Sequence, residues 1–486
     1  MQNSRKILEF HKYISGRKVA VLGVGISNRP LIRYIHSLGA VITAFDALPE
    51  NDPVLQKSRI SFEEEGIFLS WSCGENYLAA LPEGEFDLIF RTPKMRPDVP
   101  EIISAVAKGS ILTSEMEVFM DLCPARIFAV TGSDGKTTTT TLISLILKEA
   151  GYTVFVGGNI GTPLLDQIDK ILDTDMVVLE LSSFQLLTMR KSADVAVVTN
   201  ITPNHLDYHR DYQEYIDAKM NVFLTQSFSG RLVLNGENEI TRAISSDARG
   251  KVSYFTWDPR KSLTADTMTD ARPSGLFDHA YVKDGILTYY SEGIEHKIVA
   301  ANDIVIPGDH NVENYLAAIC AVMPFASTYD ISAVAKSFGG VEHRIELLRN
   351  VDGVRYFNSS IDTSPNRTIN TMKALKSRCE HGVLIAGGAD KKCDYTGLGR
   401  AILDVCDRII LCGSNASLIR EILLKECGDT AYTVIEVQEY ADAVQKAKEL
   451  AVPGEIVILS PVGTSYDRFR HFEERGNLFK QLVAEL

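Results

Sequence analysis

The stretch IFAVTGSDGKTTTTTLISLILKEAG (127–151) joins an apolar run to a helical pattern through a glycine-rich turn. Gly132 and Gly135 let backbone N–H groups wrap a phosphate chain, and the N-terminus of the following helix adds favourable dipole charge. We expect Lys136 to neutralise the β- and γ-phosphates and Thr137 to place its hydroxyl on Mg²⁺. Only Ser133 and Asp134 separate the glycines, so the usual Gly-x-x-x-x-Gly-Lys-Ser/Thr spacing is not met. The strand–turn–helix context nevertheless predicts an ATP site.

Apolar runs of strand length alternate with helical patterns along most of the chain. This βαβ rhythm predicts an α/β fold whose sheets are parallel, with helices on both faces. The predicted strands are 19–22, 41–45, 87–90, 127–132, 176–181, 195–201, 382–387, 408–413 and 455–460. A less regular region at 245–300 resembles antiparallel strands added to the middle of the chain.

The rhythm restarts twice, which divides the 486 residues into three blocks. Three domains also agree with a prior of about 150 residues per domain. We predict a Rossmann-like first domain over 1–110, a P-loop-type central ATPase domain over 111–340 and a Rossmann-like C-terminal domain over 341–486.

Composition excludes several classes of protein. Hydrophobic residues make up 45% and charged residues 23% of the chain, which is typical of globular proteins. The net charge of −13 argues against nucleic-acid binding, which needs clustered positive charge. The eight cysteines form no Cys-x-x-Cys pair, so neither a zinc site nor a disulfide framework is indicated. The longest apolar-rich stretch, 315–326, is too short to span a membrane, so we expect a cytoplasmic protein without membrane contact.

A second glycine turn, GVGISN (23–28), follows the first predicted strand, and Asp46 ends the next one. This spacing resembles a dinucleotide fingerprint, but Asn28 stands where the third glycine belongs. The pattern favours a nucleotide other than NAD, with a plain tight turn as the alternative. Gly25, Ser27 and Asp46 are the candidate contacts.

Polar residues collect at the ends of two predicted strands in the middle block. Glu180, Ser182 and Ser183 follow one strand, and the next is followed by Asn200, Asn204, His205, Asp207 and His209. Ligands of open α/β sheets lie at such carboxyl ends, and a carboxylate beside a phosphate loop is what Mg²⁺ needs. For Glu180 the alternative is a structural hydrogen bond. For His205 alone, a packed or capping role is the more common one.

Seven motifs occur together in one order, and this set resembles the Mur ligase family, which makes amide bonds on the peptidoglycan precursor. The motifs are GSDGKTT (132–138), ELSSFQL (180–186), NITPNHLDYH (200–209), GDHNVENYLAA (308–318), HRIE (343–346), GGADKK (387–392) and SPVGTSYDRF (460–469). The resemblance covers essentially the whole chain. Within the family, the ELSSFQL string is most similar to the members that add D-glutamate to UDP-N-acetylmuramoyl-L-alanine.

The resemblance implies a three-domain ligase that uses ATP and Mg²⁺, with two metal sites, and acts as a monomer. ATP would phosphorylate the carboxylate of UDP-N-acetylmuramoyl-L-alanine, and the amine of D-glutamate would then attack the acyl phosphate. Catalysis of this kind consists mostly of charge neutralisation and positioning.

The resemblance also implies the residues of each site. For ATP they are Gly132, Ser133, Asp134, Gly135, Lys136, Thr137, Thr138, Asn311, Asn314, Arg344 and Lys391. For the UDP substrate they are Gly25, Ser27, Asp46, Asn159 and Ser182. For D-glutamate they are Lys391, Ser465 and Phe472, and for metal they are Thr137, Glu180, His205 and Lys219. The implied catalytic residues are Lys136, His205, Lys219 and Arg344.

Lys219, within YIDAKMNVF (215–223), depends most on the resemblance. By itself it would be a helical surface lysine. In the family pattern it matches the lysine that is carbamylated. Carbamylation turns a cation into an anion with two oxygens, which suits a Mg²⁺ site.

The chain departs from the family pattern at two places. NSSIDTSPNRT (358–368) has Ser359 and Ile361 where many members have Asp and Lys, and RTPKMRP (91–97) has Lys94 where a glycine is usual. Because a buried carboxylate needs a cation or several donors, we predict that Arg367 replaces the missing lysine and binds D-glutamate. Three alternatives stay open: a folylpolyglutamate-synthase-like ligase, an oxidoreductase that uses the first fingerprint, and an ATP-binding paralogue without turnover.

Overall fold

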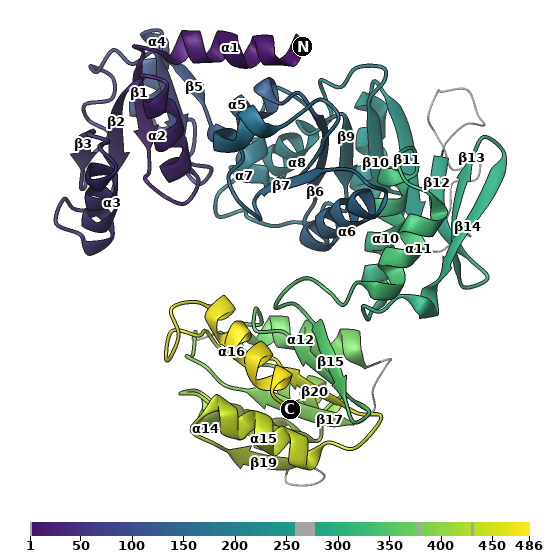
Figure 1. The fold of residues 1–486 in the computed structure, drawn as a ribbon. Helices are drawn as coiled ribbons and strands as arrows, with labels where there is room; N and C mark the ends of the chain where they lie inside the picture. The colour runs from purple at the N-terminus through teal and green to yellow at the C-terminus, as the bar shows by residue number, and fades with distance from the viewer. Residues whose placement is uncertain (1, 258–277, 377–380, 392, 429–431) are drawn as a thin grey trace. The chain divides into compact units, whose positions relative to one another are not determined.

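The computed structural model describes residues 2–257, 278–376, 381–391, 393–428 and 432–486 (Figure 1). They form two compact units, each treated by itself below. The first comprises Met1–Ile298 with Glu313–Ser332, and the second comprises Val299–Val312 with Ala333–Leu486. None of the helices in the described ranges is long and apolar enough to cross a membrane.

The first unit begins with a five-stranded parallel sheet in the order β3-β2-β1-β4-β5. Its strands are β1 (Lys18–Leu22), β2 (Val41–Asp46), β3 (Ser70–Cys73), β4 (Leu88–Arg91) and β5 (Ile111–Thr113). Its helices are α1 (Gln2–Ile14), α2 (Asn28–Ser37), α3 (Pro53–Glu64), α4 (Pro100–Ala107) and α5 (Glu115–Leu122). The four apolar residues at 19–22 are fully buried in β1, as expected for the centre of a parallel sheet.

A nine-stranded sheet follows, in the order β14-β13-β12-β11-β10-β9-β6-β8-β7, and all of it belongs to the first unit except the end of β14. Its strands are β6 (Arg126–Thr131), β7 (Val154–Gly158), β8 (Met176–Glu180), β9 (Val195–Val198), β10 (Arg231–Asn235), β11 (Lys251–Thr256), β12 (Asp278–Lys283), β13 (Ile286–Ser291) and β14 (Ile294–Ala300). The pairings from β7 to β12 are parallel, and β12 with β13 is antiparallel. The antiparallel addition predicted within 245–300 is thus present at β12 and β13, and residues 258–277 lie outside the described ranges.

Short and long helices follow these strands. They are α6 (Lys136–Glu149), η1 (Leu165–Lys170), α7 (Ser183–Leu186), α8 (Tyr212–Met220), α9 (Glu239–Ala243), η2 (Ile244–Asp247), η3 (Ala301–Asp303), α10 (Asp309–Val322) and α11 (Thr328–Ser337). Strands β8, β6 and β9 are neighbours, so the segments that follow them meet at one edge of the sheet. These segments contain the glycine turn, Glu180 and the NHLDYH string.

The second unit holds a six-stranded sheet in the order β15-β16-β20-β17-β18-β19, in which only β15 is antiparallel to its neighbour. Its strands are β15 (Glu346–Val351), β16 (Val354–Asn358), β17 (Gly382–Ala386), β18 (Arg408–Leu411), β19 (Thr433–Glu436) and β20 (Ile456–Leu459). Its helices are α12 (Pro365–Leu375), α13 (Leu398–Leu403), α14 (Ala416–Cys427), α15 (Tyr440–Leu450) and α16 (Phe472–Ala484). The predicted α/β fold with parallel-rich sheets is confirmed.

Candidate active site

The glycine turn after β6 has the geometry of a phosphate loop. Gly132 and Gly135 have φ of 146° and 78°, and Gly135 is the N-cap of α6. A Cβ at position 132 would lie 1.9 Å from Thr199 Oγ1, so only glycine fits there. The backbone N–H groups of Ser133 and Asp134 both donate to Asn200 Oδ1, at 3.1 and 2.9 Å. The turn is therefore held open at the N-terminus of α6, where an anion is favoured.

Lys136 folds back over this turn from the first residue of α6. Its Nζ donates to the carbonyls of Gly132 and Ser133 at 3.0 and 2.9 Å. Thr137 follows in the first turn of the helix and is half-buried, while Thr138 is buried. Asn314, from α10, accepts a hydrogen bond from Thr139 Oγ1 at 3.2 Å. The predicted residues 132–138 and Asn314 are thus gathered at one place.

Glu180 ends β8 next to the phosphate loop, because it pairs in register with Val130 of β6. Its side chain is buried, and Oε1 accepts a hydrogen bond from Asn159 Nδ2 at 2.7 Å. Oε2 is also buried and has no hydrogen-bond partner among the residues that the structure describes. A buried carboxylate oxygen without a partner is costly, so this atom is suited to a cation. The predicted Asn159 lies beside the predicted metal ligand.

Lys219 is not a surface lysine, because its side chain is only 1% exposed. Its Nζ donates to the Gly132 carbonyl at 2.8 Å and to Thr131 Oγ1 at 3.4 Å, and it lies 4.6 Å from the centre of the Tyr215 ring. Burial, and then the charge of Lys136, lower the pKa of Lys219 well below its usual value. The amine is therefore stabilised in its neutral, nucleophilic form beside the phosphate loop.

His205 lies on the exposed part of the loop after β9 and has a positive φ of 55°. Its ring packs edge-on against Phe184, with centroids 4.9 Å apart. Desolvation lowers the pKa of His205, and the charge of Lys136 lowers it further against the opposite effect of Asp207. The imidazole is thus favoured in the neutral form that can bind a metal ion.

Ser182 has a structural role at the same edge. It is the N-cap of α7 and forms a reciprocal capping box with Gln185. The hydrogen bonds between these two residues engage the Ser182 hydroxyl and its backbone N–H. Its predicted contact with the UDP substrate would therefore have to share a hydroxyl that already caps the helix.

In the first sheet, Asp46 supports the glycine turn predicted to bind a nucleotide. Its two carboxylate oxygens accept the backbone N–H groups of Val24 and Leu48, at 2.9 and 3.0 Å. Asn28, which replaces the third glycine, donates to the Gly23 carbonyl at 2.8 Å. Gly25 is exposed and Ser27 half-buried, so both remain open to a ligand.

The second unit contains the residues predicted for D-glutamate. Arg367 lies in the first turn of α12, and its guanidinium donates to the Ile361 carbonyl at 2.8 Å. Lys391 Nζ lies 3.3 Å from Thr363 Oγ1. Two cations therefore approach the turn at 361–363 from different elements. This is consistent with a carboxylate site near the unusual NSSIDTSPNRT segment.

Four other predicted residues belong to the same unit. Ser465 is buried after β20, and Phe472 begins α16 with its ring 6.1 Å from that of His343. Arg344 is half-buried just before β15. Asn311 is buried on α10 and donates to the Pro307 carbonyl at 2.6 Å.

Arg475 is a buried residue that the sequence analysis missed. It is fully buried, and its guanidinium donates to Ser360 and to the carbonyls of Gly463 and Thr464. It thus ties the 358–364 segment to the loop that carries Ser465. Its helical spacing from Phe472 and Phe479, which places all three on one face of α16, is the signal that could have revealed it.

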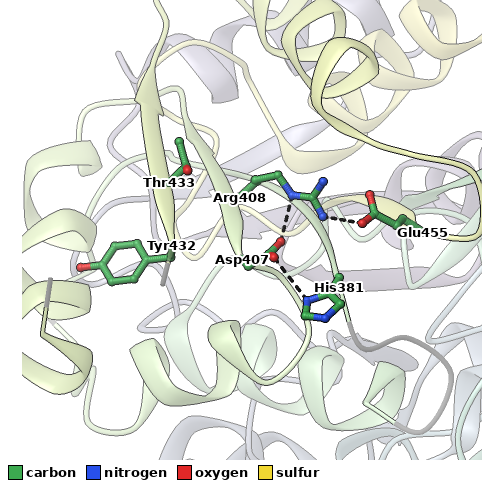
Figure 2. A pocket seen from close by; sticks show the side chains of 6 residues that line it. All are labelled: His381, Asp407, Arg408, Tyr432, Thr433 and Glu455. Atoms are coloured by element: carbon green, nitrogen blue, oxygen red, sulfur yellow. Dashed lines mark hydrogen bonds and ion pairs between the residues drawn. The ribbon is translucent and has the colours of Figure 1, made fainter. Parts of the chain in front are cut away.

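An open hollow of about 580 Å³ lies elsewhere on the second unit (Figure 2). Its lining residues are His381, Asp407, Arg408, Tyr432, Thr433 and Glu455. Most of these precede or begin strands, so the hollow lies at the amino ends of the sheet. Ligands of open α/β sheets bind at the opposite, carboxyl ends, where Lys391 and Ser465 lie.

Most of the chain matches known protein families and relatives. Residues 130–322 match the model of the Mur ligase middle domain, and residues 343–463 match that of the Mur ligase, glutamate ligase domain. A UDP-N-acetylmuramoylalanine–D-glutamate ligase from Ruminiclostridium cellulolyticum is 46% identical over 99% of this chain and 100% of its own length. A protein of the same name from Acetivibrio thermocellus is 48% identical over 99% of both chains.

Two solved structures share the fold at low sequence identity. A UDP-N-acetylmuramate-alanine ligase from Thermotoga maritima has a TM-score of 0.53 at 18% identity, over 96% of this chain and 99% of its own. A UDP-N-acetylmuramoyl-L-alanyl-D-glutamate–2,6-diaminopimelate ligase has a TM-score of 0.54 at 18% identity, over 88% of both chains. The three-domain arrangement of these ligases matches the fold class predicted from the sequence.

Proposed function

The chain belongs to the Mur ligase family of ATP-dependent ligases, and from that premise we propose how its residues join D-glutamate to UDP-N-acetylmuramoyl-L-alanine. One observation carries the proposal. The buried amine of Lys219 and the unpartnered oxygen of Glu180 lie beside a phosphate loop that ends in Lys136. These are the groups needed to hold and polarise a nucleotide triphosphate.

The reaction has two steps. A carboxylate oxygen of UDP-N-acetylmuramoyl-L-alanine attacks the γ-phosphorus of ATP, which releases ADP and forms an acyl phosphate. The amine nitrogen of D-glutamate then attacks the acyl carbon, the C–O bond to phosphate breaks, and the nitrogen loses a proton as the amide forms. Both steps build negative charge on phosphate oxygens, so fixed cations and N–H donors lower their barriers.

Residues of the phosphate loop supply this stabilisation. The N–H groups at the start of α6 face the phosphates, and Lys136 leaves its two carbonyl partners to neutralise the β- and γ-phosphate charge. Asn200 keeps the turn in its open shape during the transfer.

The donor set fits Mg²⁺ at two places. Thr137 Oγ1 and Glu180 Oε2 would hold one ion, and His205 with a carbamate on Lys219 would hold the second. Within the described part of the chain, no three His, Cys, Asp or Glu side chains are grouped to hold a metal ion, so the carbamate supplies oxygens that the sequence lacks. Bound Mg²⁺ would supply positive charge at the transferring phosphoryl group.

The first domain is proposed to bind the UDP part of the substrate. Gly25 and Ser27 are open to it, and the Asp46 carboxylate keeps their turn in place. Asn159, beside Glu180, is proposed to contact the muramoyl part. The contacts predicted from Asn311, Arg344 and Lys391 to ATP stay predictions, because these residues belong to the second unit.

The alternatives are less well supported. A folylpolyglutamate-type ligase is disfavoured because D-glutamate ligases match 99% of this chain, its first domain included. An oxidoreductase would leave Lys136, Glu180 and Lys219 without a role. A paralogue without turnover was suggested by Ser359 and Ile361. Ser359 is buried and its hydroxyl accepts the Ile345 N–H, so it serves the fold of the second unit and leaves the phosphate loop intact.

Phosphate release tests the function directly. The protein is incubated with ATP, Mg²⁺, UDP-N-acetylmuramoyl-L-alanine and D-glutamate, and each component is omitted in turn. We expect release to need all four, because the acyl phosphate forms only on the UDP substrate and is consumed by the amine. Equal release without either substrate would identify an ATPase and contradict the ligase.

Arg367→Ala tests the D-glutamate site. We expect the KM for D-glutamate to rise at least tenfold, about 1.4 kcal/mol, because a carboxylate loses its bidentate partner. The KM for ATP should change little. Lys373→Ala, at an exposed position in the last turn of the same helix, is the matched control. An unchanged D-glutamate KM in the Arg367 variant would remove this residue from the site.

A further inference from the structure

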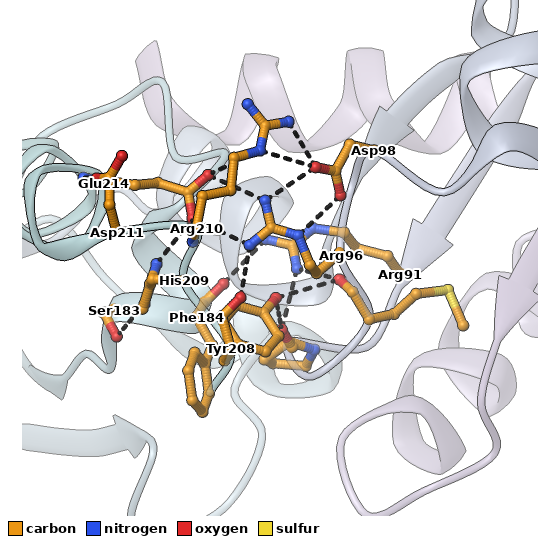
Figure 3. A network of polar contacts seen from close by, with 12 residues as sticks. Arg91, Arg96, Asp98, Ser183, Phe184, Tyr208, His209, Arg210, Asp211 and Glu214 are labelled. Atoms are coloured by element: carbon orange, nitrogen blue, oxygen red, sulfur yellow. Dashed lines mark hydrogen bonds and ion pairs between the residues drawn. The ribbon is translucent and has the colours of Figure 1, made fainter. Parts of the chain in front are cut away.

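The 91–98 loop, which begins at the last residue of β4 and leads towards α4, contacts the nine-stranded part of the first unit through two arginines (Figure 3). Arg91 is 1% exposed and donates to the Phe184 carbonyl at 3.0 Å and to Thr188 Oγ1 at 2.8 Å. It also donates to the carbonyls of Pro93 and Met95, which fixes the shape of its own loop. This loop contains the RTPKMRP string that departs from the family pattern.

Arg96 uses all of its hydrogen-bonding capacity in this contact. It forms two bonds with Asp98, at 2.8 and 2.9 Å, and two with Glu214, at 2.9 and 3.0 Å. A further bond reaches the Tyr208 carbonyl at 2.7 Å. An arginine has five N–H donors in a planar fork, and each one here has an acceptor. The guanidinium is therefore held in one orientation and holds Glu214 in return.

Glu214 contacts buried His209, which in turn contacts buried Ser183. Its Oε2 lies 3.3 Å from His209 Nδ1, and His209 Nε2 lies 2.9 Å from Ser183 Oγ. Hydrogen bonds from Arg96 lower the pKa of Glu214 to about 2, so the carboxylate is an acceptor and Nδ1 carries the donated proton. With Nδ1 donating to Glu214, Nε2 of the ring is the atom that accepts the Ser183 hydroxyl. The order of the bonds is therefore Arg96, Glu214, His209 and Ser183.

This chain of four side chains, the Arg96 chain, contacts three of the four segments that carry a proposed metal residue; the fourth is the phosphate loop with Thr137. Ser183 follows Glu180 by three residues at the end of β8. The backbone N–H of His209 donates to the His205 carbonyl at 3.0 Å, and Glu214 lies on α8, which also carries Lys219.

A serine, a histidine and a carboxylate in this order also occur in hydrolases, where the serine is the nucleophile. Ser183 is 2% exposed and is the first residue of α7, and its hydroxyl is hydrogen-bonded to His209 Nε2 at 2.9 Å. A substrate carbonyl has no access to it. The arrangement serves to position groups, and nucleophilic catalysis is excluded.

We propose that Arg96 is a positioning residue for the metal site: through Glu214, His209 and Ser183, it fixes the segments that carry Glu180, His205 and Lys219. The inference rests on the proposed function, because that function assigns metal binding to these three residues. It means that the first domain, besides binding the UDP substrate, completes the metal site of the central domain through the 91–98 loop.

Arg96→Met tests the proposal, with Arg210→Gln as the matched control. Arg210 pairs with the same two carboxylates, Asp98 and Glu214, but its side chain is 65% exposed. For Arg96→Met we expect kcat per folded molecule to fall at least tenfold and the Mg²⁺ concentration for half-maximal activity to rise at least fivefold. The KM for D-glutamate should stay within twofold. Arg210→Gln should stay within twofold in all three quantities.

Metal binding supplies a measurement that is independent of turnover. The dissociation constant of Mn²⁺, followed by electron paramagnetic resonance in the presence of ADP, should rise at least fivefold in Arg96→Met and stay unchanged in Arg210→Gln. The proposal is overturned if Arg96→Met lowers only the melting temperature and leaves kcat per folded molecule and Mn²⁺ affinity at the wild-type values. That result would show a purely structural role for Arg96.

Glu214→Gln provides a second variant in case Arg96→Met does not fold. It keeps the shape of the side chain and removes its charge, so Mn²⁺ affinity should fall in the same direction, by at least threefold. Unchanged Mn²⁺ affinity in this variant would also overturn the proposal. The wild-type protein is assayed alongside: if its phosphate release does not need both substrates, the proposed function itself fails, whatever the variants show.

Discussion

Lys219→Ala is expected to abolish amide formation, with a loss in kcat of about 10³ or more, while ATP still binds. Removing a single charge-stabilising group from such a site costs about 10² to 10³ in rate, and here a metal ligand is lost as well. ATP binding survives because Lys136 and the N-terminus of α6 are left in place.

A carbamate on Lys219 also predicts that activity depends on CO₂. CO₂ reacts with a neutral amine, and burial lowers the pKa of Lys219, which favours that reactive form over what an exposed lysine would show. Activity should therefore fall when CO₂ and bicarbonate are removed and return when bicarbonate is added. Asp217→Ala, at an exposed position on the same helix, is the control and should behave as the wild type. An alanine variant that stays active in bicarbonate-free buffer would disprove the carbamate.

Lys136→Ala should have the second largest effect. We expect ATP turnover to fall by about 10² to 10³, or 3 to 4 kcal/mol, because the charge of the transferring phosphoryl group loses its cation. Lys148→Ala, at an exposed position in the last turn of the same helix, is the control and should keep normal turnover.

Glu180→Gln separates metal binding from phosphate binding at the same site. The amide keeps the size of the side chain but has no negative charge for a cation, so the Mg²⁺ concentration for half-maximal turnover should rise. The measurement is a Mg²⁺ titration of phosphate release in the wild type and in both variants. Normal turnover and a normal Mg²⁺ requirement in Lys136→Ala and Glu180→Gln would show that the ATP site is misplaced.

The sequence could predict the strands, turns and helix starts that depend on residues close to one another in the chain. The apolar run at 127–130 and the glycines at 132 and 135 specify a buried strand, a turn with positive φ and a helix start, and all three are present. Pro365 is likewise a local signal, because proline favours the first helical turn, and α12 begins at this residue.

Contacts between residues far apart in the sequence could not be predicted in this way. Lys219 has the sequence surroundings of a surface lysine, and its burial depends on Gly132, 87 residues earlier. Arg96 appeared only as part of a departure from the family pattern, and its partner Glu214 is 118 residues away. Polar contacts of this kind leave no periodic signal in the sequence, because each depends on how the strands are ordered in the sheet.

The division of α10 between the two units has a practical consequence. The boundary falls between Val312 and Glu313, so the chain passes from one unit to the other three times, the other two passages being after Ile298 and after Ser332. No single cut in the backbone can release either unit whole. A fragment that ends at Ile298 lacks the helix carrying Asn314, and one that begins at Ala333 lacks the 299–312 segment. Expression of the protein as two separate chains, or a domain exchange with a relative, would therefore have to keep both crossing segments together.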